Sequence, residues 1–422
     1  MQNIAPQHSN KQLRKTKKKK GAKKGPQPVI YDTDYGPFID DVFALGLLAN
    51  SGDLLDLKYV IATSENPTLS AQCAAKHLNL AERSDIPVGK GVEFPDYSLR
   101  GGVCATPGLV GFALEEKCSE GETQPYDEDG IATIASMLEE SERDDWWYIV
   151  VGGQSSVKAL VEMYPAAADK ISTLIVMGGN WCSDFQPYPD VDAPTDETNI
   201  ACDPGAANFV LDSTYSPFDK IYYVPVVVAD EIGGEDYMKF VAAANSGEVG
   251  AAATLEFYKA WSEAGRADPS LLIHLEAMTY DPETESTPQF DACAVMLALE
   301  LLDDKKCEDR LTLYDIDSGV HFLEPGDDGL MPFPEAPRSA FSLLPTDFSV
   351  TELPEVCPAL TEFTFDPSET VESEMPVTVA LGFASAEAKD SFYAEMAERM
   401  AGTFPSKKGK KKSKCYGKKM RN

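Results

Sequence analysis

The chain has 422 residues, 43% of them hydrophobic, which suffices for one large α/β domain or two smaller ones with a sizeable core. Its formal net charge of −32 is unevenly spread: of 37 Lys and Arg residues, nine lie in residues 1–25 and nine in 407–422, leaving 19 against 69 acidic residues between. So acidic a body excludes nucleic acid and anionic membranes as partners, except through the basic tails.

The tails, residues 1–25 and 406–422, are almost free of apolar residues, so we expect them to be disordered and to flank one domain, 26–405. They suit a nuclear-import or polyanion-binding role, and equally a solubilising arm that folds back on the acidic body. No run of about 18 apolar residues and no secretory segment is present. The expected location is therefore cytoplasmic, with a nuclear location through the tails, or secretion if a signal exon is missing, as alternatives.

The nine cysteines are scattered and form no C-x-x-C pair, which predicts reduced, buried thiols. Cys104 and Cys118 lie in a loop-rich stretch where a disulfide could form.

The stretch from Val29 to residue 48 predicts a strand, a loop and a helix start. Apolar residues lead into Asp32 and Asp34, a Gly-Pro turn follows, and Asp40 and Asp41 open a second apolar run. Four carboxylates over ten residues repel one another unless a cation joins them, and a hard, oxygen-preferring metal is the natural one. The alternative interpretation is that Asp40 caps the helix and the other acids are solvated.

Further along, short β-rich runs alternate with helical ones. Strands are predicted at 57–63, 87–89, 146–151, 172–177, 221–228 and 376–381, and helices near 68–83, 129–140, 156–164, 237–244, 251–264, 288–301 and 385–400. Asp203 and Pro204 are typical of a helix start. Residues 90–127 are predicted to form a long surface loop. This order predicts an open, mostly parallel, Rossmann-like sheet with helices on both faces, and sites at the carboxyl ends of its strands. The turns at those ends are 34–41, 64–66, 152–156 and 178–180, and none carries a dinucleotide or P-loop motif.

Five segments, taken in order, resemble the calcium-dependent nucleoside hydrolases, that is, the inosine-uridine-preferring group and its purine-specific relatives. They are Asp32-Thr33-Asp34 with Asp40-Asp41; Glu65-Asn66; Gly152-Gly153-Gln154-Ser155-Ser156; Met177-Gly178-Gly179 with Glu197-Thr198-Asn199 and Asp203-Pro204; and Pro288 to Asp291. The resemblance implies an open α/β sheet and hydrolysis of the N-glycosidic bond of a ribonucleoside to free base and ribose.

It also implies residue roles. Calcium would be held by Asp34, Asp41, Asp291 and the main-chain carbonyl of Ser155, with Asp34 also taking the proton from a calcium-bound water. Substrate contacts would come from Asp40 to the ribose 2′-hydroxyl, Asn199 to the 3′-hydroxyl, Glu197 with Asn180 to the 5′-hydroxyl, and Asn66 to the sugar. Nearby carboxylates would stabilise the positive charge that develops on the sugar. The expected partner is thus a small ribonucleoside, and a homo-oligomer is left open.

Three features depart from the family pattern. The residues Pro37-Phe38-Ile39 make the loop before Asp40 two residues longer, and Ser155-Ser156 replaces Thr-Asn. Phe290 stands where inosine-uridine enzymes place a proton-donating histidine, and a phenyl ring cannot donate a proton.

Purine-preferring relatives place an aromatic ring before the ligand aspartate, so Phe290 predicts base stacking, with a core residue at the helix start as an equal alternative. Candidates for a second ring are Phe94, Tyr97, Trp146, Trp147 and Trp181. His77, His274 and His321 are expected to be structural.

The sequence therefore predicts a purine-leaning, calcium-dependent ribonucleoside hydrolase. One alternative is a catalytically impaired nucleoside- or ribose-binding protein on the same fold. The other is a magnesium phosphatase that uses the D-x-D of Asp32 and Asp34.

Overall fold

The structure is a computed structural model that describes residues 25–36, 38–95, 112–119, 125–179, 198–212, 214–268, 274–302, 310–316, 320–321, 342–343 and 377–403. The predictions for both basic tails, and those for Cys104, Tyr97, Asn180, Trp181 and Glu197, lie outside the described residues.

One eight-stranded sheet forms the centre of the fold, with strand order β3-β2-β1-β4-β5-β6-β10-β7. All neighbouring pairs are parallel except β10 with β7, so the predicted open, mostly parallel sheet is confirmed. Its strands are β1 (Gln27–Thr33), β2 (Leu55–Ser64), β3 (Val88–Glu93), β4 (Trp146–Val150), β5 (Ile171–Met177), β6 (Lys220–Val224), β7 (Leu311–Ile316) and β10 (Val377–Phe383). A separate two-stranded ladder joins β8 (Val320–His321) and β9 (Ser342–Leu343).

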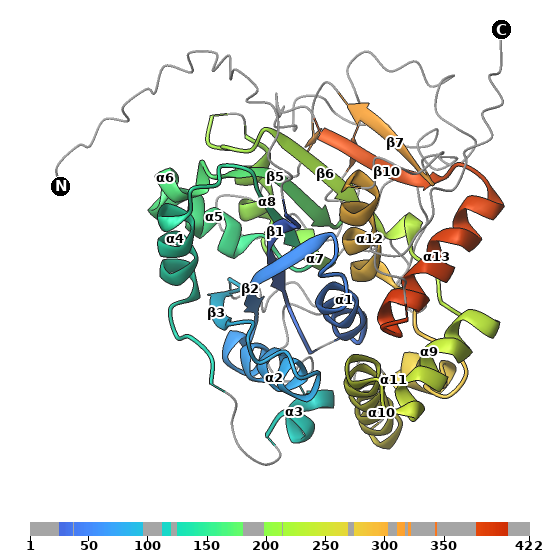
Figure 1. The fold of residues 1–422 in the computed structure, drawn as a ribbon. Helices are drawn as coiled ribbons and strands as arrows, with labels where there is room; N and C mark the ends of the chain where they lie inside the picture. The colour runs from blue at the N-terminus through green and yellow to red at the C-terminus, as the bar shows by residue number, and fades with distance from the viewer. Residues whose placement is uncertain are drawn as a thin grey trace, which may run out of the picture.

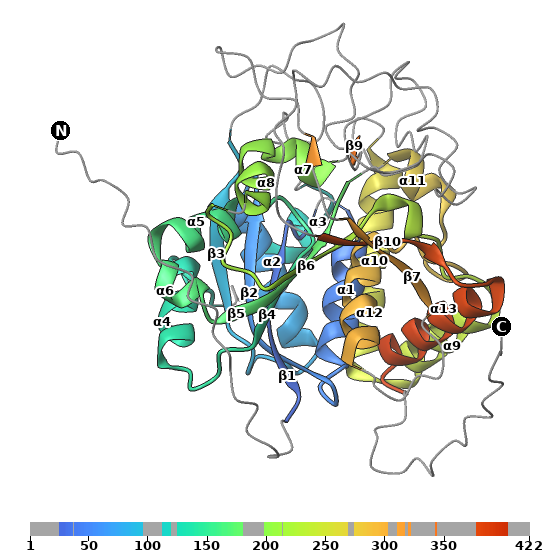
Figure 2. The ribbon, with the colours of Figure 1, turned by 90° about the horizontal axis from the view of Figure 1, so that it is seen from above.

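Helices cover both faces of the sheet (Figures 1 and 2). The face toward α1 carries α1 (Asp40–Ala49), α2 (Pro67–Leu80), α3 (Phe112–Ser119), α9 (Gly234–Ser246), α10 (Val249–Ala267), α11 (His274–Thr279), α12 (Phe290–Leu302) and α13 (Ala386–Met400). The other face carries α4 (Gly130–Glu140), α5 (Ser155–Met163), α6 (Pro165–Ala168), α7 (Thr198–Cys202) and α8 (Pro204–Leu211). A short 3-10 helix, Val226–Val228, follows β6.

The alternation of side chains along each strand separates two hydrophobic cores. On β1, Val29 and Tyr31 belong to the larger core beneath α1, whereas Ile30 belongs to the smaller core beneath α4 and α5. Every residue of β1 is buried, as expected for a central strand of a parallel sheet with both faces covered.

The strand order reverses its direction between β1 and β4. From β1 the chain proceeds outward through β2 and β3, and then returns to the other side of β1 with β4, β5 and β6. In open α/β sheets, ligands bind at the carboxyl ends of the strands beside such a reversal. The described residues of the loops after β1 and β4, namely 34–36, 38–39 and 151–154, lie at that point.

Side-chain caps begin several of the described helices, among them the one predicted at Asp203, whereas the cap considered at Asp40 is absent. Asp129, Asp203 and Ser385 each accept a hydrogen bond from the main-chain N–H three residues on. Asp40, in contrast, is not the cap of α1, because Ile39 occupies that position and forms no side-chain capping bond. Asp40 and Asp41 instead lie in the first helical turn, so the interpretation of Asp40 as a cap is wrong.

The expectation of reduced thiols is also wrong for part of the chain. Cys73 of α2 and Cys118 of α3 form a disulfide with a Cα–Cα distance of 4.9 Å, and Cys202 is disulfide-bonded as well. Cys118 thus pairs with a residue 45 positions earlier, because α3 packs beside α2. Among the described cysteines, Cys293 is free and buried.

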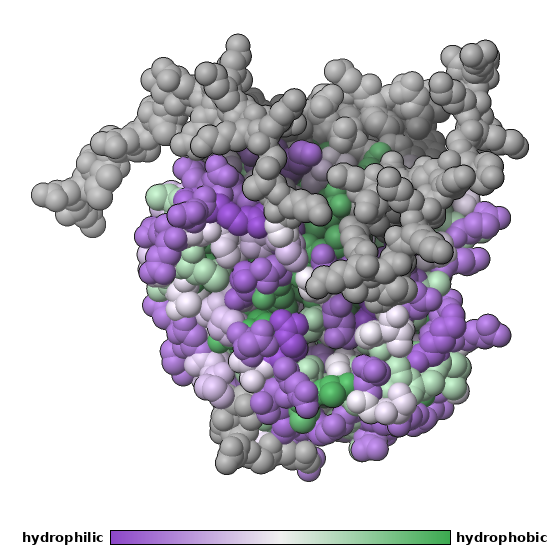
Figure 3. All heavy atoms as spheres, in the orientation of Figure 1, coloured by the Kyte–Doolittle hydropathy of each residue, from purple (hydrophilic) through white to green (hydrophobic). Residues whose placement is uncertain are grey.

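Among the described helices, none combines the length and the apolar character needed to cross a membrane. Hydrophilic residues make up most of the described surface visible in Figure 3. This agrees with the large excess of acidic residues in the body of the chain.

Candidate active site

Three buried carboxylates converge where the helices α1 and α12 begin. Asp40 and Asp41 come from the first turn of α1 and Asp291 from that of α12, and one carboxylate oxygen of each lies within 4.8 Å of the other two. Their exposed fractions are 8%, 2% and 3%. The partial positive charge of two helix N-termini favours acids here but does not neutralise three. A cation bound by oxygen ligands would do so.

The pKa values of this trio show that it is unfavourable for all three carboxyl groups to be ionised without a cation. Burial raises the pKa of Asp40 to about 7. Burial first, and then the neighbouring charge of Asp40, raise the pKa values of Asp41 and Asp291 well above their usual range. Oxygen donors gathered in this way fit a hard divalent cation such as calcium, which takes several carboxylate ligands.

The end of β1 is tied directly to this trio. Thr33 donates a hydrogen bond from Oγ1 to Oδ1 of Asp41, so the last residue of β1 fixes a side chain of α1. The two additional residues in the loop therefore do not move Asp41 away from Asp291.

Asp34 follows β1 and lies beside the trio rather than within it. The close group among the described residues consists of Asp40, Asp41 and Asp291, whereas the sequence predicts ligation by Asp34, Asp41 and Asp291. Asp34 is 8% exposed, and burial, followed by the charges of Asp41 and Glu65, raises its pKa well above the usual range. It therefore belongs to the same electrostatic site, and its role as ligand and base remains a prediction.

The turn after β4 closes against Asp34. A Cβ on Gly152 would lie 2.9 Å from Oδ1 of Asp34, so only glycine leaves room for that carboxylate. Ser155 donates from Oγ to Oδ2 of Asp203 at 2.6 Å, which engages its side chain. The predicted contribution of Ser155 is its main-chain carbonyl, which this bond leaves unaffected.

Two predicted sugar contacts have structural partners already. The Oδ1 of Asn66 accepts from the N–H of Leu69 and caps α2, and the residue is exposed. The Nδ2 of Asn199 donates to the carbonyls of Val151 at 2.6 Å and Met177 at 3.3 Å, joining α7 to the ends of β4 and β5.

Two glutamates join the site without a role predicted from the sequence. Glu65 follows β2, and burial raises its pKa to about 7; it is an electrostatic neighbour of Asp34 and Asp41. Burial, then the charge of Asp40, raises the pKa of Glu276 in α11 to about 8. Glu65 could have been identified from the sequence, because it directly follows a predicted strand. Glu276 could not, because the short helix α11 has no apolar periodicity that predicts it.

The described aromatic candidates lie at opposite ends of the strands of the sheet. Phe290 is half-buried and packs against the larger core. Phe94 is 6% exposed and lies against the turn after β4, since a Cβ on Gly153 would come within 2.5 Å of its ring. Trp146 and Trp147 begin β4 at the amino edge of the sheet, away from the site.

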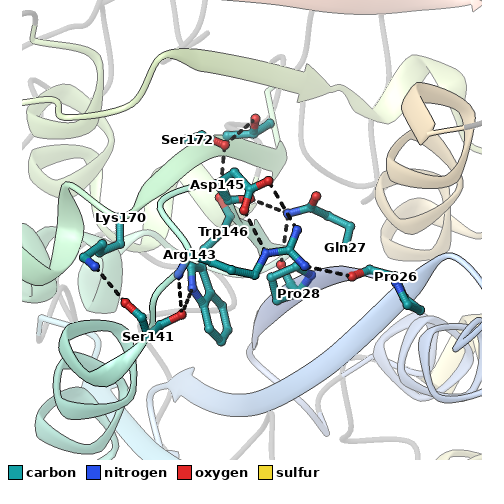
Figure 4. Close-up of polar contacts among 10 residues, drawn as sticks. Pro26, Gln27, Pro28, Ser141, Arg143, Asp145, Trp146, Lys170 and Ser172 are labelled. Atoms are coloured by element: carbon teal, nitrogen blue, oxygen red, sulfur yellow. Dashed lines mark hydrogen bonds and ion pairs between the residues drawn. The ribbon is translucent and has the colours of Figure 1, made fainter. Parts of the chain in front are cut away.

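Figure 4 shows the surroundings of Trp146 at that amino edge, where its Nε1 donates to Oγ of Ser141 at 3.0 Å. There Arg143 pairs with Asp145 and donates to the carbonyl of Pro26, which joins the start of β1 to that of β4. Trp146 and Trp147 are therefore at the start of β4 and cannot stack on a substrate at the carboxyl ends of the strands, so they are excluded as the second ring.

Of the histidines, His77 is structural. Its Nδ1 is 2.8 Å from Oη of Tyr35 and its Nε2 is 3.1 Å from Oγ1 of Thr254, and burial lowers its pKa to about 3. The side chains of His274 and His321 lie outside the described part of the structure.

Comparison with known proteins identifies the fold and the chemistry. Residues 29–384 match the sequence profile of the inosine-uridine preferring nucleoside hydrolases. The chain belongs to that family. The pyrimidine-specific ribonucleoside hydrolase RihA of Escherichia coli O127:H6 is 29% identical over 248 residues, covering 55% of this chain and 71% of RihA.

Solved structures share the fold at lower identity. The plant nucleoside hydrolase PpNRh1 is 18% identical with a TM-score of 0.57, covering 90% of this chain and 100% of that one. The purine-preferring ribonucleoside hydrolase of Gardnerella vaginalis is 16% identical with a TM-score of 0.55, covering 89% and 99%.

The protein is thus an enzyme of the ribonucleoside hydrolase class, which cleaves N-glycosidic bonds, and its family depends on a metal, with which the buried aspartate trio is compatible. The phosphatase interpretation fails on this finding and on Asp32 itself. Asp32 is fully buried, and Thr63 and Tyr148 occupy its two oxygens, so its carboxylate is not accessible to a substrate as a nucleophile.

Proposed function

We propose that this nucleoside hydrolase is calcium-dependent, uses Asp34 as its general base and favours purine ribonucleosides. The observation that carries the proposal is the buried group of Asp40, Asp41 and Asp291 next to Asp34, at the reversal of strand order. So many buried carboxylates at one point require a cation to remain ionised together.

The residues that would hold calcium are Asp34, Asp41, Asp291 and the carbonyl of Ser155. A bound calcium ion would neutralise these acids and make a coordinated water more acidic. Asp34 would then accept the water proton, and its position against Gly152 limits the directions in which its carboxylate can turn.

The remaining acids would act on the sugar. Asp40, itself a member of the trio, would bind the 2′-hydroxyl of a ribose held beside Asp41 and Asp291. Together with Glu65 and Glu276, it would give the site a negative potential that stabilises the cationic sugar of the transition state.

The purine preference rests on the two aromatic side chains. Phe290 directly precedes Asp291, and Phe94 packs over the turn after β4. Rings in these positions suit stacking on a base, and a purine offers the larger face. Because phenylalanine cannot protonate the departing base, leaving groups that depart without such help are favoured.

Calcium titration by calorimetry tests the metal assignment separately from turnover. The wild-type protein, stripped with chelator, should bind one calcium ion, and Asp291→Ala should bind it at least about 100-fold more weakly, because one ligand is lost. Equal affinities for the two proteins would contradict the assignment.

A further inference from the structure

A chain of hydrogen bonds runs beneath the active site, on the sheet face opposite the aspartate trio. Oη of Tyr148 donates to Oδ2 of Asp32 at 2.8 Å, and Oγ1 of Thr63 donates to Oδ1 at 2.5 Å. Oγ1 of Thr63 also lies 2.5 Å from Oγ of Ser156, which accepts from the N–H of Val92 at 2.9 Å. All four of these side chains are completely buried.

With Asp32 ionised, the direction of every proton in this chain follows from counting donors. Thr63 has one hydroxyl proton and gives it to Asp32. Ser156 must therefore donate to Thr63, since the Thr63 hydroxyl has no second proton to offer. The N–H of Val92 in turn donates to Ser156. All donors thus lead to Asp32, the one acceptor at which both the chain and the Tyr148 bond end.

The chain connects the elements that carry the proposed metal ligands. Asp32 belongs to β1, two residues before Asp34, and Ser156 follows Ser155 at the start of α5. Thr63 joins them from β2. The N–H of Val151 also donates to the carbonyl of Asp32 at 2.9 Å, so the ends of β1 and β4 are linked through main chain and side chain alike.

We propose that Asp32 is a positioning residue, which fixes Asp34 and the Ser155 carbonyl relative to each other through Thr63 and Ser156. This inference rests on the proposed function, since it concerns how the calcium ligands are held. Asp32 is completely buried and therefore does not touch substrate itself.

The surrounding packing leaves the chain no room to rearrange. A Cβ on Gly91 would lie 2.6 Å from Oγ of Ser156 and 2.7 Å from Oγ1 of Thr63, so the backbone of β3 closes over both hydroxyls. Residues that orient metal ligands in this way typically contribute 10–100-fold to metal affinity.

Calorimetric titration of calcium into chelator-stripped protein tests the proposal. Asp32→Asn places an amide N–H where the carboxylate accepts, which reverses at least one bond of the chain, and calcium affinity should fall about 10–100-fold. Thr63→Val removes the connecting hydroxyl at nearly constant volume and should weaken binding about tenfold, whereas Thr63→Ser should restore most of the affinity. The threonine pair decides the matter if Asp32→Asn does not fold.

A control separates positioning from a general loss of stability. Ser141→Ala removes the acceptor for Trp146 Nε1 at the amino edge of the sheet (Figure 4), so it should lower the melting temperature without changing the calcium affinity. Unchanged affinity in Asp32→Asn and Thr63→Val, or an equal loss in Ser141→Ala, overturns the proposal. If the wild-type protein itself binds no calcium, the proposed function fails, and this inference fails with it.

Discussion

Gly152 leaves the space that the carboxylate of Asp34 occupies, because a Cβ at residue 152 would lie 2.9 Å from Oδ1 and 3.0 Å from Cγ of Asp34. The reversal of strand order brings these two residues together, since β1 and β4 are neighbours whose carboxyl ends carry them. The position of the proposed base thus depends on a residue that has no side chain.

Gly152→Ala should therefore displace Asp34 and lower kcat about 100-fold, as misplacement of a reacting group by about 1 Å can do. Steady-state kinetics with inosine measure the effect. The control is Gly52→Ala, where a Cβ meets nothing within 4 Å, and this variant should retain wild-type rates. Wild-type kcat in Gly152→Ala would mean that the position of Asp34 is not critical.

The stability of the metal-free protein should increase as pH falls. Burial raises the pKa values of Asp40 and Glu65 to about 7 and that of Glu276 to about 8. Between about pH 5 and 7 the folded protein therefore binds more protons than the unfolded chain, so the unfolding free energy decreases as pH rises, by about 1.4 kcal/mol per pH unit and proton. His77, whose pKa is lowered to about 3, opposes this below about pH 6.5 with a single proton.

Melting curves in chelator should accordingly show a higher Tm at about pH 5.5 than at about pH 8. Calcium should raise the Tm more at the higher pH, because it binds the ionised carboxylates. A calcium-induced shift that does not depend on pH would contradict the proposed site.

The residue before Asp291 should set the preference for the base. Phe290→His introduces a proton donor beside the proposed base site, and the ratio of kcat/KM for uridine to that for inosine should rise at least about tenfold. Phe290→Leu, which removes the ring without adding a donor, should lower the inosine rate and leave uridine hydrolysis no faster. An unchanged ratio in Phe290→His would identify Phe290 as a core residue.

The disulfide between Cys73 and Cys118 should stabilise the folded state by about 2–4 kcal/mol, because it closes a long segment of the unfolded chain. Cys73→Ser should therefore lower the Tm by several degrees, and reductant should affect this variant less than the wild type. Cys293→Ser, at a thiol that is already free, should keep the full response to reductant. An equal effect of reductant on Cys73→Ser and the wild type would mean that this bond contributes little.

Local sequence signals predicted the sheet and much of the site. Apolar runs followed by Asp34 and Gly152 placed both residues at strand ends, and parallel topology brought those ends together. The helix start at Asp203 followed from a capping residue that acts within four positions.

What the sequence did not predict depends on long-range packing or on the face of a strand. Asp32 seemed to be one of four converging acids, but adjacent side chains of a strand point to opposite faces, so Thr33 contacts Asp41 while Asp32 contacts Tyr148. The pairing of Cys73 with Cys118 depends on how α2 and α3 pack, and no local pattern encodes it.

The most direct test of the account is the release of reducing sugar from inosine, guanosine, adenosine, uridine and cytidine by wild type and Asp34→Asn, each in calcium and in chelator. We predict release by the wild type in calcium, faster from the purines, abolished by chelator and reduced at least about 1,000-fold in Asp34→Asn. Release that persists in chelator, or in Asp34→Asn at the wild-type rate, would contradict the central claim. Release from none of the five would instead indicate a nucleoside-binding protein.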